Sequence, residues 1–253
     1  MKKILLLTSA VFTTYAASAV SPGDGDKKNT IEFHGKGLAN STFLFNNNIS
    51  DQGNTQDYAA GWGFNYGAGF TMYFGKCGFG VEGLFGNHTG AYAGSIDVKD
   101  GAGNVLSTED YTSSVNLKIT QIPVFFKMKS ETGGYFEVGP QYNMISEANY
   151  HFSGSGTTMD TLVTNDYAKS YFSAVIGVGF KAGIPKTRFS ILAGIRLQYS
   201  LTDLEGVDAL GEAFKNPFTY KDPQTTSAAT GGFVIGAVYT LGEKKAKKEK
   251  KKD

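Results

Sequence analysis

The stretch Trp62-Gly-Phe-Asn-Tyr-Gly-Ala-Gly-Phe-Thr-Met-Tyr-Phe74 alternates strictly between two kinds of side chain. Its even-numbered positions are aromatic or apolar, whereas its odd-numbered positions are mainly Gly, Asn and Thr. Successive side chains of a β-strand point to opposite faces of the sheet. This period of two therefore predicts a long strand with one apolar face and one face of small and polar residues.

The same alternation recurs along the chain. The segments together make eight expected strands: 31–45, 62–74, 79–89, 111–128, 134–146, 169–184, 188–202 and 228–241. Tight connections alternate with long polar loops, the loops falling at 46–60, 90–110, 147–167 and 203–226. An even number of strands with short turns on one side and long loops on the other is typical of outer-membrane proteins. The pattern predicts an all-β fold: an eight-stranded antiparallel up-and-down transmembrane β-barrel with short periplasmic turns and four long extracellular loops.

A soluble eight-stranded barrel, such as a lipocalin-like carrier, is the competing interpretation. A water-exposed barrel face needs roughly a quarter to a third of charged residues. The polar face of these strands is instead mostly Gly, Ser, Thr, Asn and Gln, and charged residues make up 19% of the whole chain. The sequence therefore favours a membrane barrel whose Phe, Ile and Val side chains face lipid and whose polar side chains line a narrow lumen.

Length and composition exclude several other classes of protein. The 253 residues suit one domain. A single cysteine rules out a disulfide scaffold and a cysteine-based zinc site. A net charge of +1 argues against a generally basic nucleic-acid binder, so we expect no nucleic acid among the partners.

The two ends of the chain carry different signals. Residues 1–19 combine two lysines, a short apolar run and an Ala-Ser-Ala cleavage pattern, which predict a secretory signal peptide. Residues 20–30 are expected to form a linker, and residues 31–242 the outer-membrane barrel. Residues 243–253 contain seven lysines and three acids. We expect them to form a disordered periplasmic tail that contacts peptidoglycan or anionic lipid.

Strand parity places a set of charged residues inside the barrel. An eight-stranded lumen is about wide enough to be filled by its own side chains, so three acids and four bases predict a salt-bridged plug. A proton or ion path along the same charges is the alternative. The predicted network comprises Glu32, Lys36, Glu82, Lys118, Glu137, Lys181 and Arg196.

The four expected loops are acidic, with 14 acidic and 3 basic residues. Solvation of exposed loops accounts for such a composition, and divalent cations are the alternative partners of these acids.

Signals for catalysis are weak. His34 is expected inside the barrel, His88 at the top of the third strand and His151 in the third loop. His88 lies near Ser95 and Asp97 in sequence, the residue types of a hydrolase triad, but no motif fixes their geometry. We expect the loop histidines to be solvated, and no His pair has the spacing of metal ligands. The sequence thus predicts no enzyme, no cofactor and no metal site.

Two adjoining segments carry a family resemblance. The first, residues 117–129, contains Ile122, Pro123 and Lys127, and the second, residues 134–142, contains the Gly139-Pro140 pair. Together they resemble the small outer-membrane β-barrel family of Bacteroidota-type bacteria, which includes PorT-like proteins. Near the C-terminus, Gly236, Tyr239 and Leu241 are similar to the signal that the barrel-insertion machinery reads.

The resemblance and the strand pattern imply a location in the cell outer membrane, surrounded by its lipid. The function that we expect is a non-enzymatic structural or surface-contact role. The alternatives are an accessory factor in protein secretion, as the PorT-like resemblance implies, a narrow channel, and a loop-borne hydrolase or acyltransferase.

Overall fold

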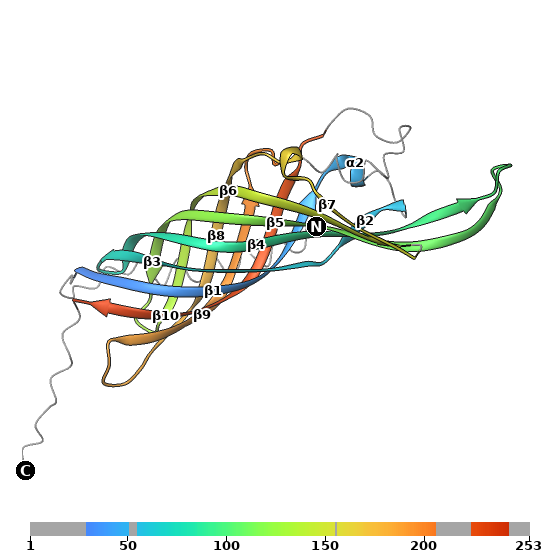
Figure 1. Cartoon of the computed structure of the whole chain (residues 1–253). Helices are drawn as coiled ribbons and strands as arrows, with labels where there is room; N and C mark the ends of the chain where they lie inside the picture. Colours follow the sequence, from blue (N-terminus) through green and yellow to red (C-terminus); the bar gives the residue numbers. More distant parts are fainter. Residues whose placement is uncertain (1–28, 51–54, 155, 206–223, 243–253) are drawn as a thin grey trace, which may run out of the picture.

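The computed structural model describes residues 29–50, 55–154, 156–205 and 224–242. Within them eight long strands close into a ring (Figure 1), in the order β4-β3-β1-β10-β9-β8-β6-β5, with β5 paired to β4. All neighbours in the ring are antiparallel. The ring strands are β1 (Asn29–Phe45), β3 (Gly61–Phe74), β4 (Cys77–Lys99), β5 (Val105–Lys129), β6 (Gly134–Gly154), β8 (Ser170–Gly183), β9 (Phe189–Ser200) and β10 (Ser227–Leu241). The predicted eight-stranded barrel is confirmed.

Short elements cover the end that carries the long connections. The strand β2 (Asp57–Ala59) pairs with β4, and β7 (Thr157–Leu162) pairs with β6. A four-residue helix, α2 (Asn47–Ser50), and a 3₁₀ turn, η2 (Thr164–Asp166), complete this end. The expected signal peptide, nearly all of the linker and the lysine-rich tail lie outside the described residues. Among the described residues, no helix is long and apolar enough to cross a bilayer.

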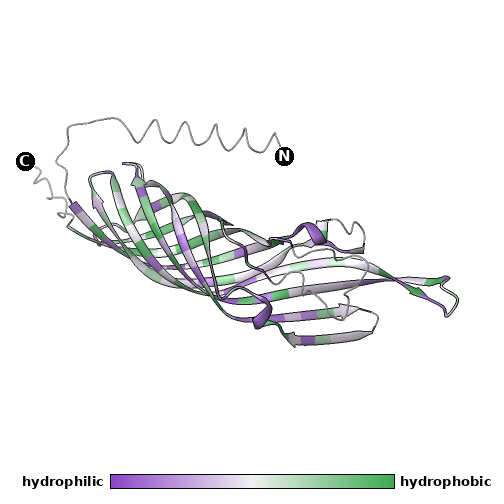
Figure 2. Cartoon of the chain, turned by 90° about the horizontal axis from the view of Figure 1, so that it is seen from above, coloured by the Kyte–Doolittle hydropathy of each residue, from purple (hydrophilic) through white to green (hydrophobic). Residues whose placement is uncertain are grey.

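The two faces of the barrel wall match the alternation in the sequence. Apolar and polar residues alternate along the strands (Figure 2). Trp62 on β3 and Phe233 on β10 expose 67% and 69% of their surfaces to the outside, whereas Asn65 and Gln141 point inward and are fully buried. Backbone groups in the bilayer must be hydrogen-bonded within the protein, and a closed antiparallel ring achieves this without a free strand edge.

Two predicted loops are largely β-structure, which corrects the sequence analysis. β4 and β5 continue as a hairpin through 90–110, from the Gly90–Val115 pair to the Lys99–Val105 pair. β6 likewise runs on to Gly154 and turns back as β7. The outer face of these extensions meets water, and at the hairpin tip both faces do, so the apolar alternation that marks a membrane strand fades while the backbone pairing continues. Figure 1 shows the β4–β5 hairpin reaching well beyond the barrel.

Candidate functional site in the barrel lumen

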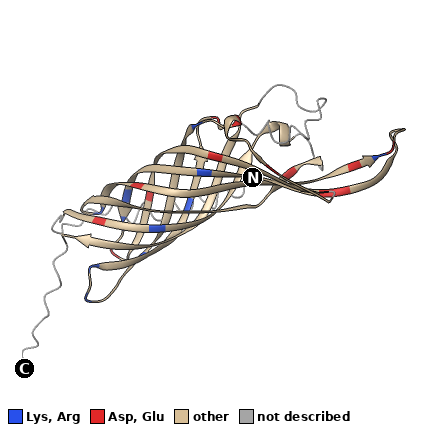
Figure 3. Ribbon diagram, in the orientation of Figure 1, with Lys and Arg blue, Asp and Glu red and all other residues tan. Residues whose placement is uncertain are grey.

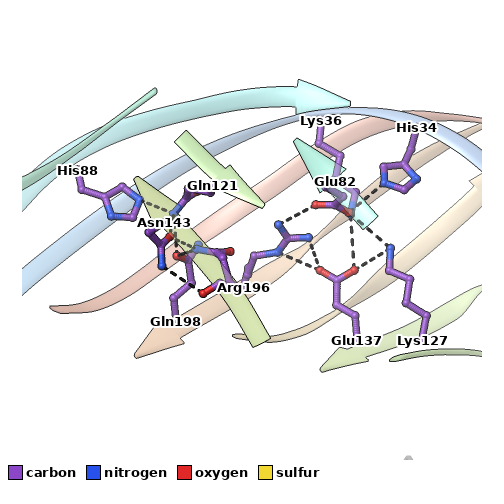
Figure 4. Close-up of polar contacts among 11 residues, drawn as sticks. His34, Lys36, Glu82, His88, Gln121, Lys127, Glu137, Asn143, Arg196 and Gln198 are labelled. Atoms are coloured by element: carbon purple, nitrogen blue, oxygen red, sulfur yellow. Dashed lines mark hydrogen bonds and ion pairs between the residues drawn. The ribbon is translucent and has the colours of Figure 1, made fainter. Parts of the chain in front are cut away.

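Five buried charges form an ionic layer across the lumen. Arg196 on β9 lies between two carboxylates, donating from Nη1 to Glu82 Oε2 at 3.0 Å and from Nε to Glu137 Oε1 at 2.9 Å (Figure 4). Arg196 Nη2 also donates to Glu137. Lys36 Nζ lies 2.5 Å from Glu82 Oε1, and Lys127 Nζ lies 2.8 Å from Glu137 Oε2. All five side chains are at most 4% exposed.

Small residues on neighbouring strands make room for this layer. Gly177 on β8 is the register partner of Glu137. A Cβ atom at Gly177 would lie 2.7 Å from Glu137 Cγ, so a larger residue would displace the carboxylate. Glycine is therefore needed at this lumen position for space, since any side chain would have to share the volume that Glu137 fills.

Lys118 is not part of the network, contrary to the prediction. It points out of the barrel, its side chain is 57% exposed, and its Nζ lies 2.8 Å from Glu147 Oε1 on β6. Lys127, which the sequence analysis assigned only to the family motif, takes an interior place instead. The two lysines are nine positions apart on one strand, an odd spacing that places them on opposite faces.

The remaining predicted members lie at the end of the lumen with the short turns. Lys181 Nζ donates to Glu32 Oε1 at 2.5 Å, and Lys129 Nζ lies 3.8 Å from the same oxygen. His34 lies between this pair and the ionic layer, with Nε2 2.9 Å from Glu82 Oε1. The predicted position of His34 inside the barrel is thus correct.

A layer of amide side chains, the amide layer, lies next to the ionic layer on the side away from the short turns. Gln121 Nε2 donates to Gln198 Oε1 at 3.0 Å and to Asn143 Oδ1 at 3.2 Å. Asn143 in turn donates to Ser173 Oγ at 2.5 Å. His88 lies in the same layer, 1% exposed, with Nε2 3.2 Å from Asn65 Oδ1. His88 lies on a strand, β4, as predicted, but it is buried in the lumen and not solvated as expected.

Apolar side chains close the lumen beyond the amides. They come from β1, β4, β5, β6 and β8, from α2 and from the β9–β10 connection. Their burial makes this level of the lumen apolar. The cluster includes Leu44, Ile49, Tyr92, Val115, Leu117, Ile145, Tyr150, Phe152, Tyr171 and Leu204.

The family-motif residues meet on two paired strands. Pro123 on β5 pairs with Gln141 on β6, next to Gly139 and Pro140. A Cβ atom at Gly139 would lie 1.8 Å from the Val124 carbonyl oxygen, so only glycine permits this approach of the strands. Ile122 points outward, whereas Lys127 joins the ionic layer.

The assembly-signal residues lie on β10, the last strand. Gly236 faces the lumen opposite Lys36. Tyr239 and Leu241 lie on the outer face, and the Tyr239 ring packs against Phe189 at a centroid distance of 5.1 Å.

The candidate catalytic residues are not brought together. His88 is buried in the amide layer, whereas Asp97 lies on the projecting hairpin and accepts a 2.9 Å hydrogen bond from Thr108. His151 Nδ1 does lie 2.7 Å from Asp160 Oδ1, and Ser114 is its register partner. This row lies on the outer face of the β5–β6–β7 ladder, where the His151 and Asp160 side chains are exposed to water.

Among the described residues, no group of three or more His, Cys, Asp or Glu side chains is placed to hold a metal ion.

The barrel, its polar lumen and its apolar outer band agree with a comparison to known protein families. The family model described as "Outer membrane protein beta-barrel domain" matches residues 25–206. The chain belongs to this family. This outer-membrane barrel is thus placed in the outer membrane of Gram-negative bacteria. The match does not distinguish PorT-like members, so that part of the resemblance stays a prediction.

The chain is similar to several solved outer-membrane proteins at low sequence identity. Ail, the attachment invasion locus protein of Yersinia pestis, is 13% identical, with 85% of this chain and 99% of that one covered and a TM-score of 0.36. OprG from Pseudomonas aeruginosa is 16% identical over 87% and 99% of the two chains, with a TM-score of 0.33. The outer membrane protease OmpT from Escherichia coli is 10% identical over 88% and 100%, with a TM-score of 0.31. No curated protein matches the chain.

Proposed function

We propose that this outer-membrane barrel acts at the cell surface, without catalysis or conduction, through contacts made by its β4–β5 hairpin. The observation that carries the proposal is the contrast between a lumen filled by side chains and a hairpin that projects far outside it. An ionic layer, an amide layer and an apolar cluster lie one above another in the lumen. Such filling argues against a channel, and the scattered His, Ser and Asp residues argue against a hydrolase.

The hairpin is longer than the membrane requires. A tilted strand crosses the hydrocarbon with about 9–11 residues, whereas β4 and β5 have 23 and 25. The strands paired with this hairpin end before its tip. β2 pairs with β4 as far as Ala93, and β6 pairs with β5 as far as Tyr111. Beyond these points the hairpin is a two-stranded ribbon with two free edges, and a free edge can accept another strand.

The tip of the hairpin is built to hold its shape. The Asp100 carboxylate accepts hydrogen bonds from the backbone N–H of Ala102 at 2.9 Å and of Asn104 at 2.8 Å. Hydrogen bonds from Asn104 lower the pKa of Asp100, which keeps the carboxylate ionised and the turn closed. Gly103 has a φ of 88°, a left-handed conformation that glycine adopts without strain.

The hairpin surface combines apolar and acidic groups. Val105 and Leu106 at the tip are more than half exposed. Asp97, Glu109 and Asp110 flank them, and Figure 3 shows acidic residues along the hairpin. A protein partner with an exposed strand edge and basic side chains fits this surface, because charge complementarity favours encounter and selects the partner.

Site-specific photo-cross-linking in intact cells tests the proposal. A cross-linking residue at Leu106 is expected to give a discrete protein adduct, and the double substitution Asp97→Lys/Glu109→Lys is expected to abolish it. Asp160→Lys on the β6–β7 hairpin is the matched control and should leave the adduct unchanged. Absence of any adduct from a correctly inserted barrel would contradict the proposal, as would an adduct indifferent to the charge reversal.

A further inference from the structure

A ladder of polar side chains, the polar ladder, covers the outer face of β5, β6 and β7 near the long connections (Figure 1). Residues that lie opposite one another in neighbouring strands share a face of the sheet. Four rows of register partners therefore point outward together. The rows are Lys118–Glu147, Asn116–Asn149–Leu162, Ser114–His151–Asp160 and Thr112–Ser153–Thr158.

Hydrogen bonds within the ladder fix the orientation of its side chains. Lys118 Nζ lies 2.8 Å from Glu147 Oε1, and Asn149 Nδ2 donates to the same oxygen at 2.6 Å. Asn116 Nδ2 donates to Thr89 Oγ1 on β4 at 3.1 Å. Each contact uses part of the hydrogen-bonding capacity of a side chain, so the oriented amides still present donors and acceptors to a ligand.

The ladder also offers an apolar contact beside its polar groups. Leu162 is 67% exposed on the same face. His151 Nδ1 lies 2.7 Å from Asp160 Oδ1, and these two side chains are 48% and 78% exposed. A sugar ring matches this mixture, because its hydroxyl groups form hydrogen bonds while its C–H groups pack against an apolar surface.

The polar ladder continues directly from the lipid-facing surface of the barrel. On the outer face of β5, Val124 and Ile122 are 49% and 38% exposed, and Lys118 lies farther along the same face. A lipid whose acyl chains cover Val124 and Ile122 therefore has its headgroup at Lys118. The long connections of an outer-membrane barrel are extracellular, so this lipid belongs to the outer leaflet.

The height of the ladder indicates an extended headgroup. From Lys118 to Thr112 the ladder runs about 20 Å along β5, or roughly 15 Å along the membrane normal at a strand tilt of about 40°. The headgroup layer of an ordinary bilayer is about 5–8 Å thick in each leaflet. A phospholipid headgroup thus reaches the first row or two, whereas a headgroup of several linked sugars spans all four.

The far side of the ring has a different outer surface. The outer face of β1 is apolar at its end, where the Phe43 and Phe45 rings stack with their centroids 6.0 Å apart. Tyr199 near the end of β9 and Leu201 just beyond it are 50% and 65% exposed. Polar contacts to a headgroup are therefore concentrated on one side of the barrel, which favours one lipid in a defined place over an even coat of lipids.

We propose that the polar ladder binds the saccharide headgroup of an outer-leaflet glycolipid, whose acyl chains lie against the adjoining apolar band. With His151 neutral, the charged residues of the four rows are Lys118, Glu147 and Asp160, one cation and two anions. This balance does not attract an anionic headgroup. Neutral hydroxyl groups suit it, because they donate to the carboxylates and exchange hydrogen bonds with the amides and hydroxyls.

The test uses the barrel purified from outer membranes in detergent micelles, with purified lipopolysaccharide as the probe. Native mass spectrometry counts the lipid bound per barrel and gives its apparent affinity. We expect one lipopolysaccharide per barrel. Phosphatidylglycerol has acyl chains and a phosphate but no sugar, so we expect it not to displace the bound lipid. Equal competition by phosphatidylglycerol would overturn the proposal.

Substitutions in the second row locate the site. Asn116→Ala/Asn149→Ala removes both amides, and we expect it to weaken the apparent affinity for lipopolysaccharide at least tenfold. Asn29→Ala is the matched control, because Asn29 is an exposed amide at the short-turn end, away from the outer leaflet. An affinity that the double substitution leaves unchanged would contradict the proposal.

A second variant keeps the test decisive if the double substitution does not fold. The His151 side chain is 48% exposed, so His151→Ala leaves the packing of the barrel intact. We expect it to weaken the affinity at least threefold. Wild-type affinity in His151→Ala would confine the lipid to the first rows and overturn the assignment of the ladder to a saccharide.

Discussion

The half of the barrel next to the short turns (the lower half) and the half next to the long connections (the upper half) have opposite polarity. Between the short turns and the amide layer, charged and amide side chains fill the lumen while Phe, Ile and Val cover the outside. Beyond the amide layer the lumen is apolar, and the outer face carries residues such as Lys118, Glu147 and His151. The change of solvent along the barrel axis explains this inversion: lipid surrounds the first half and water surrounds the second.

The inversion can be located on β5. Leu117 and Ile119 face the lumen, and the next inward residue is Gln121. On the outside Lys118 gives way to Ile122. A register shift between Lys118 and Ile119 marks the same level. The upper half is therefore organised as a soluble β-protein, with a dry core and a wet surface, and the lower half as its reverse.

The largest effect is expected in the ionic half. Among the described residues, Glu137→Met leaves Arg196, Lys36 and Lys127 with one close carboxylate, Glu82, and breaking a buried pair in this way costs roughly 3–5 kcal/mol. Arg196→Met leaves two lysines with two acids, so it should lower the free energy of unfolding by less. Chemical unfolding in lipid vesicles measures both values. The reverse order of the two variants would show that the hydrogen bonds donated by Arg196, and not charge balance, hold the layer together.

The apolar half is expected to respond as a soluble core does. Leu117 is 1% exposed, so Leu117→Ala removes buried methyl groups and leaves a cavity in their place. Such a cavity lowers the free energy of unfolding by roughly 2–5 kcal/mol. Leu117→Asn should be at least as damaging, because it adds a buried polar group without an assigned partner. The same vesicle unfolding assay applies. If Leu117→Asn is tolerated, the upper lumen is hydrated and the contrast between the halves fails.

The outer faces of the two halves are expected to differ in how well they tolerate a charged residue. Ile176 lies on the lipid face of β8, and Ile176→Arg near the bilayer midplane costs roughly 2–4 kcal/mol. Thr112→Arg, on the exposed outer face of the upper half, is the matched control and should have little effect on stability. Similar losses for the two variants would mean that the membrane boundary lies elsewhere on the barrel.

The lower half could be predicted from the sequence because its polarity is uniform along each strand. Trp62 to Phe74 shows both faces directly, and Glu137 and Arg196 fall on the inner face of regular alternations. Placing polar strand residues in the lumen is correct only where lipid surrounds the barrel, and this rule therefore misplaces Lys118. The run Ile122 to Phe126 is apolar on both faces, so it does not show which residues of β5 point inward.

The arrangement of the upper half of the lumen, and of the ion pairs at its short-turn end, depends on contacts between distant residues that the sequence does not show. His88 is buried on β4 because amides from the neighbouring strands β3 and β5 meet it inside the lumen. The ion pairs of Glu32 with Lys129 and Lys181 require β1, β5 and β8 to converge at one end of the barrel. Lys127 and Lys129 lie two positions apart and therefore on the same face of β5. This spacing is the sequence signal for a second lysine on the inner face of that strand.

The smallest expected effect distinguishes the outer from the inner lysine of β5. A hydrogen bond from Lys118 is the main cause that lowers the pKa of Glu147, with a further contribution from Asn149. Lys118→Ala should therefore raise the pKa of Glu147 toward its ordinary value of about 4.3, as measured by a pH titration of the labelled side chain by NMR. A carboxylate with a lowered pKa stabilises the folded state above its ordinary pKa, and this contribution is lost as the pH falls through the lowered value. The wild type and Lys118→Ala should thus differ slightly at neutral pH and converge in acid. Because water screens the exposed pair, a large loss of stability in Lys118→Ala would place this lysine inside the barrel after all.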